Sequence, residues 1–322
     1  MKNNVKDYQW PSSFNDSPRK YNIKYESKNV RKLVENIERY FQKKYHYKTI
    51  LFPSARAGIA SILRFLKIDR SKEVFVNKWV SHCIFNTIGR YSNVSTSFKS
   101  PNLGLAIHKW GFEQIFPKKK NFTIIEDSVD SIFLSKDHMF VNGGEFEILS
   151  MPKIIGSICG GIVVTKNLNF YNFSKKEQMK NKDLGQYQSR RKFEEFNKKK
   201  TFHTWLYHES KNTFLEHNAL VDIKKNIKNF EVNKKIIFTR TKAFKSDFNK
   251  IAYFSKRLGP VIPIKYKLIK DHNLMTKHFL LRNLHKTKNH IETFEKVYLL
   301  PTHFKISKNK YQLYIEILKK SI

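Results

Sequence analysis

The chain has 322 residues, of which 40% are hydrophobic and 14% aromatic, and its formal net charge is +35. This apolar content suffices for a packed core and argues against a disordered chain. The start of the chain lacks a signal-peptide pattern, no apolar run is long enough to span a bilayer, and two cysteines, Cys83 and Cys159, are too few for a disulfide framework or a metal cluster. We therefore expect a cytoplasmic protein without a membrane span.

The large positive charge has two explanations. A polyanion partner, either nucleic acid or an acidic membrane surface, is one of them. The other is a composition biased toward lysine, and it is favoured because the charges are scattered along the chain and no zinc-finger, RNP or basic-zipper pattern accompanies them. We expect no specific nucleic-acid partner, although an anionic substrate fits both explanations.

The first half of the chain alternates between helix and strand patterns. In chain order, the pattern first predicts a helix over residues 29–45 and then, over 48–68, a strand, a turn at Pro53-Ser54 and a helix. A strand, a loop and a helix follow over 73–91. Residues 121–133 contain an apolar strand that ends in the carboxylates Glu126 and Asp127, and a further strand is predicted over 160–167. Strands that alternate with helices indicate an α/β core with crossover connections.

The second half of the chain is less regular. Residues 167–229 are polar, aromatic and rich in lysine, and we expect helices there that pack over the core. A helix over residues 233–250 is followed by a predicted strand, helix, strand and helix over 259–267, 273–286, 296–304 and 309–320. We predict a large α/β domain over residues 1–235 and a small α+β domain over 236–322.

Four features fall at the ends of predicted strands, where open α/β sheets bind ligands. The first is a helix start, at which backbone amides and the helix dipole suit an anion. The second is a tryptophan that can stack on a flat ring, the third a pair of carboxylates, and the fourth a lysine in an apolar turn bounded by glycines. They are Ser54-Ala55-Arg56, Trp79, Glu126-Asp127 and Lys153. Singly, each has an ordinary explanation: an N-cap, a core side chain, a turn carboxylate or a solvated lysine.

Together the four features describe a site for pyridoxal 5′-phosphate (PLP). The segments PSARAG, FVNKWVSHCIFNTI, AIHKWGF, IIEDSVDS, SMPKIIGSICGGIVVTK and VYLLPTHFKISKNKYQLYIEIL occur in this order. In order and local pattern the chain resembles the DegT/DnrJ/EryC1/StrS sugar aminotransferases. The resemblance implies a fold-type I PLP-transferase, with a mostly parallel central sheet flanked by helices and a smaller C-terminal α+β domain.

The resemblance also implies a role for each matching residue. Lys153 forms the Schiff base with PLP and shuttles the proton, while Asp127 pairs with the pyridinium nitrogen. Trp79 stacks on the ring, the amides of Ala55 and Arg56 together with Ser150 hold the phosphate, and Asp130 lies near the phenolic oxygen. His82, close to Trp79 in the sequence, could line the pocket. The implied activity is transamination of a nucleotide-linked keto sugar, with glutamate as amino donor, in a homodimer whose pockets are completed by the partner, for example by residues 189–210.

Three departures from the family pattern leave alternatives open. Asp130 stands where the family usually has glutamine, which is unfavourable unless the carboxyl is protonated, turned away or paired with a cation such as Arg56 or His82. Cys159 replaces the acidic residue that commonly precedes Gly-Gly, and residues 91–107 are too few for the usual strand and helix. The alternatives are a degenerate member that acts as a binding or scaffold protein, a PLP-dependent sugar dehydratase, and a sequence-independent nucleic-acid binder.

Lys153 itself carries the sharpest expectation. Its neighbours Ile154, Ile155 and the Gly160-Gly161 pair predict a pocket of apolar and backbone surface. Desolvation there should lower the pKa of the Lys153 amine and favour attack on a carbonyl near neutral pH. We therefore expect Lys153 to be the lysine that borohydride traps as a stable secondary amine with PLP.

Overall fold

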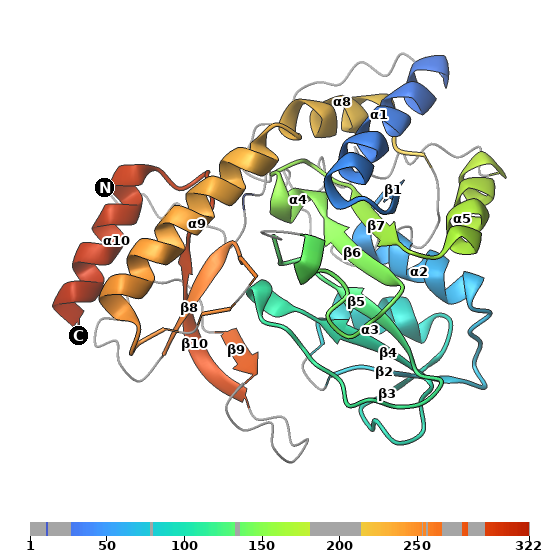
Figure 1. Ribbon diagram of the computed structural model, residues 1–322, viewed down its shortest axis with the longest axis horizontal. Coiled ribbons are helices and arrows are strands. Elements are labelled where there is room, and N and C mark those ends of the chain that lie inside the picture. The colour runs from blue at the N-terminus through green and yellow to red at the C-terminus, as the bar shows by residue number, and fades with distance from the viewer. Residues whose placement is uncertain are drawn as a thin grey trace, which may run out of the picture.

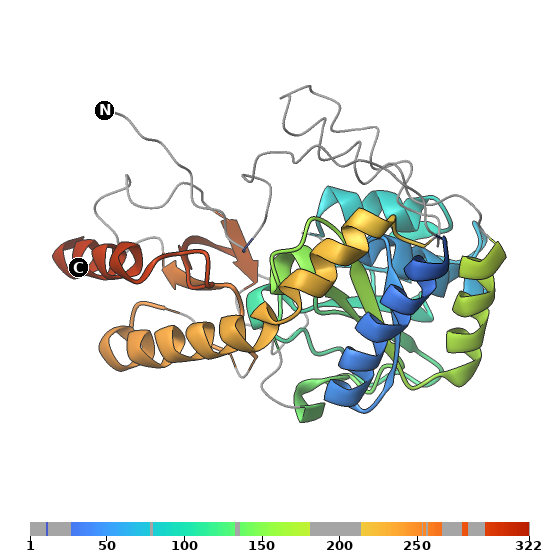
Figure 2. The same ribbon diagram turned by 90° about the horizontal axis from the view of Figure 1, so that it is seen from above.

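The computed structural model describes residue 11 and residues 27–77, 80–132, 136–180, 214–252, 254–255, 257–265, 279–282 and 294–321. Figures 1 and 2 show a large sheet with its helices beside a small sheet, and the long helix α9 (Asn229–Phe248) extends from the first toward the second. In this part of the chain, no helix is both long enough and apolar enough to cross a membrane.

The large sheet has seven strands in the order β1-β7-β6-β5-β4-β2-β3. Neighbours from β6 to β3 pair in parallel, whereas β7 is antiparallel to both β1 and β6. The prediction of a mostly parallel sheet is confirmed. In sheet order the strands span Lys48–Phe52, Gly161–Thr165, Phe146–Ser150, Thr123–Asp127, Leu103–Ile107, Glu73–Phe75 and Asn93–Ser95.

Helices cover both faces of this sheet because its central strands are apolar on both sides. Alternate residues of β1 divide between the faces: Ile50 and Phe52 pack in one apolar cluster, and Leu51 packs in the other. The first cluster includes residues of α2 (Ala55–Phe65), α3 (His82–Gly89) and α5 (Leu168–Lys180). The second includes residues of α1 (Ser27–Tyr45), α8 (His217–Asn226) and α9. The result is a three-layer α/β/α arrangement.

The carboxyl ends of the parallel strands bring together segments that are distant in the sequence. Ile107, at the end of β4, pairs with Asp127, at the end of β5, and Asp127 pairs with Ile148 of β6. The short helices η1 (Lys109–Gly111) and α4 (Met151–Ile154) begin just beyond β4 and β6. Lys153 therefore lies at the same sheet edge as Asp127, and the turn expected around Lys153 contains the single-turn helix α4. A second short helix, η2, spans Lys136–His138.

The small sheet is antiparallel, with the order β8-β10-β9. Its strands β8, β10 and β9 span Val261–Lys265, Phe294–Pro301 and Phe279–Arg282, and α10 spans Lys308–Ser321. The helix predicted over 273–286 is wrong at 279–282, where β9 pairs with β10 and tertiary pairing overrides a helix-like pattern. The predicted boundary at residue 235 falls inside α9, and the division at that residue remains our proposal.

Residues 91–107 contain β3 and β4 without a helix between them, in agreement with the length of the segment. Neither β4 nor β6 was predicted. Both are five-residue strands buried along most of their length, so neither shows the alternation that marks a half-buried strand. Because β4 was not predicted, the sequence also did not place the residues that follow it, such as Lys109, at this sheet edge.

Candidate functional site

The proposed phosphate-binding segments meet across Gly161, the first residue of β7. Gly161 pairs with Phe52 on one side and with Ser150 on the other. A Cβ atom at Gly161 would lie 2.3 Å from the amide nitrogen of Ala55, so only glycine allows this approach. The start of α2 and Ser150 are therefore held on two sides of one glycine.

Gly160 fixes the two loops that flank this contact. Its N–H donates to the carbonyl of Pro53 (3.0 Å), and its own carbonyl accepts from the N–H of Met151 (3.0 Å). Its φ of +103° lies in the left-handed region that favours glycine. The glycine pair thus couples the Pro53-Ser54 turn to the start of α4, the helix that carries Lys153.

Helix α2 begins as the sequence predicts. Ser54 is its N-cap, and the Ser54 hydroxyl accepts from the N–H of Ala57 at 3.1 Å. The amides of Ala55 and Arg56 belong to the first turn, where the helix dipole favours an anion. This end of the helix, next to Ser150, has the chemistry that a phosphate requires.

Asp127 is the last residue of β5, and only 1% of its surface is exposed. Its Oδ1 accepts from the N–H of Val129 at 3.1 Å. Among the described residues, no lysine, arginine or histidine lies within ion-pair distance of it. Burial raises the pKa of Asp127 to about 6, although the nearby Lys153 lowers it. A buried carboxylate of this kind would gain from a cationic N–H such as a pyridinium nitrogen.

Glu126 lies next to Asp127 in the sequence but has different partners. Its side chain accepts from Nε2 of His108 (2.7 Å), and from the backbone N–H and side-chain amide of Asn142 (both 2.8 Å). Nδ1 of His108 accepts in turn from the N–H of Gln114 (3.0 Å), which places the ring proton on Nε2. Burial alone would raise the pKa of Glu126, but these hydrogen bonds outweigh burial and bring the pKa below its usual range. Of the two carboxylates, Glu126 holds loops and Asp127 is available to a ligand.

Lys153 is paired with Asp130. Its Nζ lies 2.8 Å from Oδ1 of Asp130, and the two side chains are 23% and 11% exposed. Burial alone lowers the pKa of Lys153, but the charges of Asp130 and Asp127 outweigh burial and raise the pKa above its usual value. The expectation of a lowered pKa is therefore wrong, because it considered burial without the carboxylates.

The sequence left three ways to accommodate Asp130: a protonated carboxyl, a side chain turned away, or pairing with a cation such as Arg56 or His82. The cation that the structure places on Asp130 is Lys153. His82 lies at the start of α3, exposed, with Nδ1 3.3 Å from the side-chain amide of Asn86. Trp79 lies outside the described residues, as does the whole segment 189–210 that was expected to complete a partner's pocket.

Helices α8 and α9 support the lysine segment from behind. The N–H of Ile158 donates to Asp222 of α8 (2.7 Å), and the side-chain amide of Asn233 of α9 donates to the carbonyl of Ile154 (2.7 Å). Cys159 is 3% exposed and packs in the apolar cluster between these helices and the sheet. An acidic side chain would be costly there, which explains how a cysteine is accommodated at this position.

Sequence reasoning missed Lys109, the first residue of η1. The Lys109 residue is half-buried, and its ammonium lies 4.5 Å from the centroid of the Trp110 ring. It sits at the carboxyl end of β4, next to the end of β5. The missed strand is the reason, since a lysine directly after a buried strand would have been placed at this edge.

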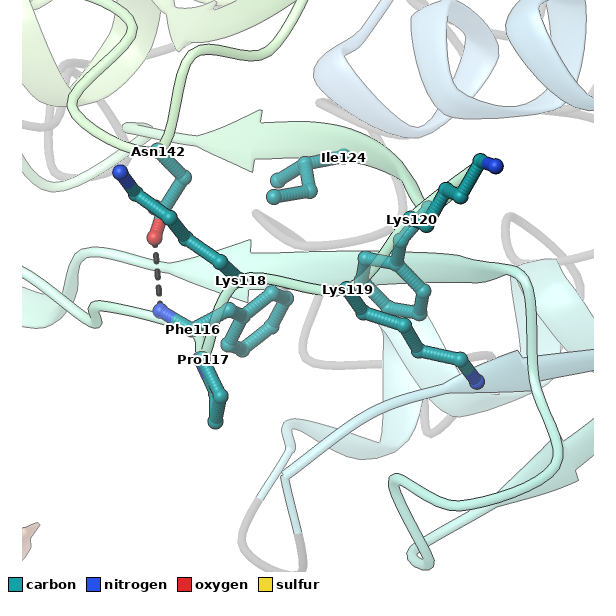
Figure 3. A pocket seen from close by; sticks show the side chains of 8 residues that line it. Phe116, Pro117, Lys118, Lys119, Lys120, Ile124 and Asn142 are labelled. Atoms are coloured by element: carbon teal, nitrogen blue, oxygen red, sulfur yellow. Dashed lines mark hydrogen bonds between the residues drawn. The ribbon is translucent and has the colours of Figure 1, made fainter.

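An open pocket lies at the opposite end of β5, before Thr123. Figure 3 shows Phe116, Ile124, Asn142 and the lysines 118–120 around it. Lys119 donates to the carbonyl oxygens of Lys99 (2.8 Å) and Pro101 (2.5 Å), and Asn142 is bonded to Glu126. This pocket holds no carboxylate or lysine of the predicted site, so it is separate from the Lys153 site.

The Lys153 site fits PLP by three observations. Gly161 brings the start of α2 next to Ser150, Asp127 is buried with a raised pKa, and Lys153 lies just beyond β6 at the sheet edge where Asp127 ends β5. Small side chains and a helix N-terminus suit a phosphate, and the carboxylate suits a ring nitrogen.

Residues 37–321 match the family model described as "Putative PLP-dependent aminotransferase". This chain belongs to that family. The match covers both sheets, and the cofactor of the family is PLP, as the sequence predicted. No curated protein matches the chain significantly.

Solved structures share its fold at low sequence identity. A DegT/DnrJ/EryC1/StrS aminotransferase from Brucella abortus is 10% identical, with a TM-score of 0.59 over 89% of this chain and 90% of that one. DesI, in the presence of its TDP-sugar product, is 11% identical, with a TM-score of 0.61 over 90% and 84%. GDP-4-keto-6-deoxymannose-3-dehydratase, with a trapped PLP-glutamate geminal diamine, is 12% identical, with a TM-score of 0.53 over 72% and 71%. The fold is therefore that of fold-type I sugar aminotransferases, and the predicted resemblance is confirmed.

Proposed function

We propose that this PLP-dependent aminotransferase aminates a keto sugar carried on a nucleotide, with glutamate as the amino donor, in the biosynthesis of a surface polysaccharide or glycoconjugate. The observation that carries the reaction type is the position of Lys153, which faces Asp130 and lies beyond β6 at the edge where Asp127 ends β5. The sugar substrate rests on likeness: DesI is described with a TDP-sugar product, and the dehydratase with PLP-glutamate.

Each residue of the site has a proposed task. PLP supplies an aldehyde that condenses with an amine with loss of water, and a ring that withdraws electrons from the adjacent carbon. Lys153 provides that amine and afterwards moves a proton at the reacting carbon. Asp127, buried at the end of β5, holds the ring nitrogen protonated. The amides of Ala55 and Arg56 and the side chain of Ser150 hold the phosphate, beside Gly161.

Two further residues complete the assignment. We propose that Trp79 stacks on the PLP ring, as the resemblance implies. Asp130 would lie near the phenolic oxygen of PLP, as the resemblance implies, and its charge is paired with Lys153 at 2.8 Å.

Other functions have less support. A sugar dehydratase shares the fold, but relatives of that activity typically carry histidine in place of the lysine, and this chain has Lys153. A degenerate binding or scaffold protein would be favoured by Asp130 and Cys159. The structure accommodates both residues, one in an ion pair and the other in the apolar core.

We also propose a homodimer, in which a partner subunit completes each pocket. The support is the resemblance to sugar aminotransferases. Light scattering coupled to gel filtration at micromolar concentration should give twice the mass of 38.4 kDa. A strictly monomeric protein would contradict both this assembly and a pocket that needs a partner.

Cofactor trapping tests the role of Lys153. Purified protein should gain the visible absorbance of bound PLP, and borohydride should fix the cofactor on the peptide that contains Lys153. Lys153→Ala should abolish the absorbance and the label, whereas Lys166→Ala, an exposed lysine at the end of β7, should change neither. Label spread evenly over surface lysines would refute the assignment.

Substrate class needs a separate assay. Holoenzyme with glutamate should be converted to its amine form, and a nucleotide-linked keto sugar should return it to the PLP form. A glutamate half-reaction without any response to keto sugars would keep the aminotransferase and refute the sugar.

A further inference from the structure

The segment that carries Lys109 is fixed against the segment that carries Asp130. The N–H of His108 donates to the carbonyl of Asp127 at 2.8 Å, and the hydroxyl of Ser131 donates to the carbonyl of His108 at 3.1 Å. Lys109 follows directly after His108, and Asp130 directly precedes Ser131. Two hydrogen bonds therefore hold the backbone that carries a second lysine next to the backbone that carries the Asp130 carboxylate.

The aromatic neighbour of Lys109 restrains the lysine side chain. Trp110 is 1% exposed and has a φ of +54°, a left-handed conformation that a bulky residue adopts only under the constraint of its surroundings. The Lys109 ammonium lies 4.5 Å from the centroid of this ring. A cation over a buried indole is held by the electrostatic attraction of the ring face.

Lys109 and Lys153 therefore both lie near the Asp130 segment, and Asp130 acts electrostatically on both. Burial lowers the pKa of the Lys109 amine, attraction to Asp130 raises it, and repulsion from Lys153 lowers it again. Lys153 itself is hydrogen-bonded to Asp130 at 2.8 Å. The Lys153 ammonium must lose its charge before its nitrogen can attack an aldehyde. At that point Asp130, with a side chain only 11% exposed, loses the cation to which it is bonded.

We infer that Lys109 is a positioning residue of this site: it serves as the cation of Asp130 when Lys153 gives up its charge. The inference rests on the proposed role of Lys153. In the family that the chain resembles, a neutral glutamine usually stands at the Asp130 position and needs no such cation. Here the negative charge of Asp130 and the positive charge of Lys109 together would give the neutral environment that the glutamine provides alone.

The inference predicts a specific pattern of coupling. Lys109→Met should leave Asp130 without a cation in the PLP form and weaken PLP binding about tenfold or more. Asp130→Asn should bind PLP well, because an amide needs no cation. In the double variant Lys109→Met/Asp130→Asn, the loss caused by Lys109→Met should disappear. Binding is measured by titrating apoprotein with PLP and following the visible absorbance.

A matched control separates charge from packing. Lys119 is also a half-buried lysine near an aromatic ring, 5.5 Å from the centroid of Phe122, but it lies at the other end of β5. Lys119→Met should leave PLP affinity unchanged. Thermal unfolding of every variant checks that each one folds, and a loss with Lys109→Met that Asp130→Asn does not rescue would overturn the inference.

A second readout does not need the cofactor. In apoprotein, slow reductive methylation with formaldehyde followed by peptide mapping reports the fraction of each lysine that is unprotonated. Removing the repulsion of Lys109 should slow the methylation of Lys153, and Asp130→Asn should speed it. If the apoprotein variants show this coupling but wild type takes up no PLP, the proposed function fails and the arrangement of Lys109, Asp130 and Lys153 stands. If PLP labels Lys153 but neither readout couples Lys109 to Asp130, the inference alone is wrong.

Discussion

Glu126 and Asp127 are consecutive carboxylates at the end of one strand, and the structure gives them opposite surroundings. Glu126 accepts from His108 and Asn142, and these hydrogen bonds hold its pKa below the usual range. Asp127 accepts from the N–H of Val129, and burial raises its pKa to about 6. Because side chains alternate along a strand, each residue faces a different layer of the molecule.

The difference separates a carboxylate that the fold neutralises from one that it leaves without comparable donors. The charge of Glu126 is neutralised by donors that the fold supplies, so it stabilises the folded state. The charge of Asp127 lacks comparable donors, so its ionisation costs stability, and a cationic ligand would recover that cost. A carboxylate that the fold leaves poorly solvated is better evidence for a binding role than its position at a strand end.

The largest effect is expected at Arg257, which lies beside Glu147, a buried carboxylate that, like Glu126, has partners supplied by the fold. Its fully buried guanidinium donates to the Ser128 hydroxyl (2.8 Å) and lies 3.4 Å from Oε1 of Glu147. Burial raises the pKa of Glu147 to about 7 even though Arg257 lowers it. Arg257→Met would leave Glu147 and Ser128 without this cation and should reduce the free energy of unfolding by about 3–5 kcal/mol. Urea unfolding at pH 7 measures the change.

Glu147→Gln provides the control for Arg257. The double variant Arg257→Met/Glu147→Gln should recover part of the loss, because no buried carboxylate then lacks a cation. If Arg257→Met reduced the free energy of unfolding by less than about 1 kcal/mol, the contacts among Arg257, Glu147 and Ser128 would stabilise the fold no more than a surface ion pair does. Partners supplied by the fold would then not distinguish Glu147 from Asp127.

The sequence predicted this site better than it predicted its electrostatics. The positions of Ser54, Asp127 and Lys153 were predicted because apolar runs and glycines mark turns there, although β6, the strand before Lys153, was not predicted. The Lys153–Asp130 ion pair was not, since it joins residues 23 positions apart through the pairing of β5 with β6. Lys109 was missed for a related reason, because β4, which positions it, lacks the alternating pattern of a half-buried strand.

The second prediction is that Asp127→Asn stabilises the apoprotein at neutral pH. The folded-state pKa of Asp127, about 6, lies above the ordinary value of 3.8, so folding favours the protonated carboxyl. The stabilisation by this group is complete below about pH 4 and is lost as the pH rises through about 6. A shift of about two units corresponds to up to about 3 kcal/mol at pH 7, which the amide variant should regain. Chemical unfolding of apoprotein from pH 4 to pH 7 measures it.

The same substitution should abolish transamination, since an amide cannot hold a ring nitrogen protonated. Asp69→Asn, at an exposed carboxylate in a surface turn, is the matched control and should leave activity and the pH dependence in this range intact. Equal stability of wild type and Asp127→Asn at pH 7 would show that Asp127 has a partner that neutralises it, and its contrast with Glu126 would be lost.

The smallest effect is expected for Glu126→Gln, and its sign is opposite. Every contact of Glu126 named above is a donor pointing at a carboxylate oxygen, from His108 Nε2 and from both nitrogen groups of Asn142. A glutamine amide would turn its NH2 group toward one of these donors, which should cost about 1–2 kcal/mol at pH 7.

Because the pKa of Glu126 is lowered, its contribution to stability is present above about pH 4.5 and is lost as the pH falls through the folded-state pKa. The unfolding free energy of Glu126→Gln minus that of wild type should therefore be negative at pH 7 and rise toward zero in acid, whereas the same difference for Asp127→Asn should be positive at pH 7 and fall toward zero in acid. Urea unfolding of both variants at pH 4 and pH 7 compares the two slopes directly, and slopes of the same sign would refute the division of roles between these neighbouring carboxylates.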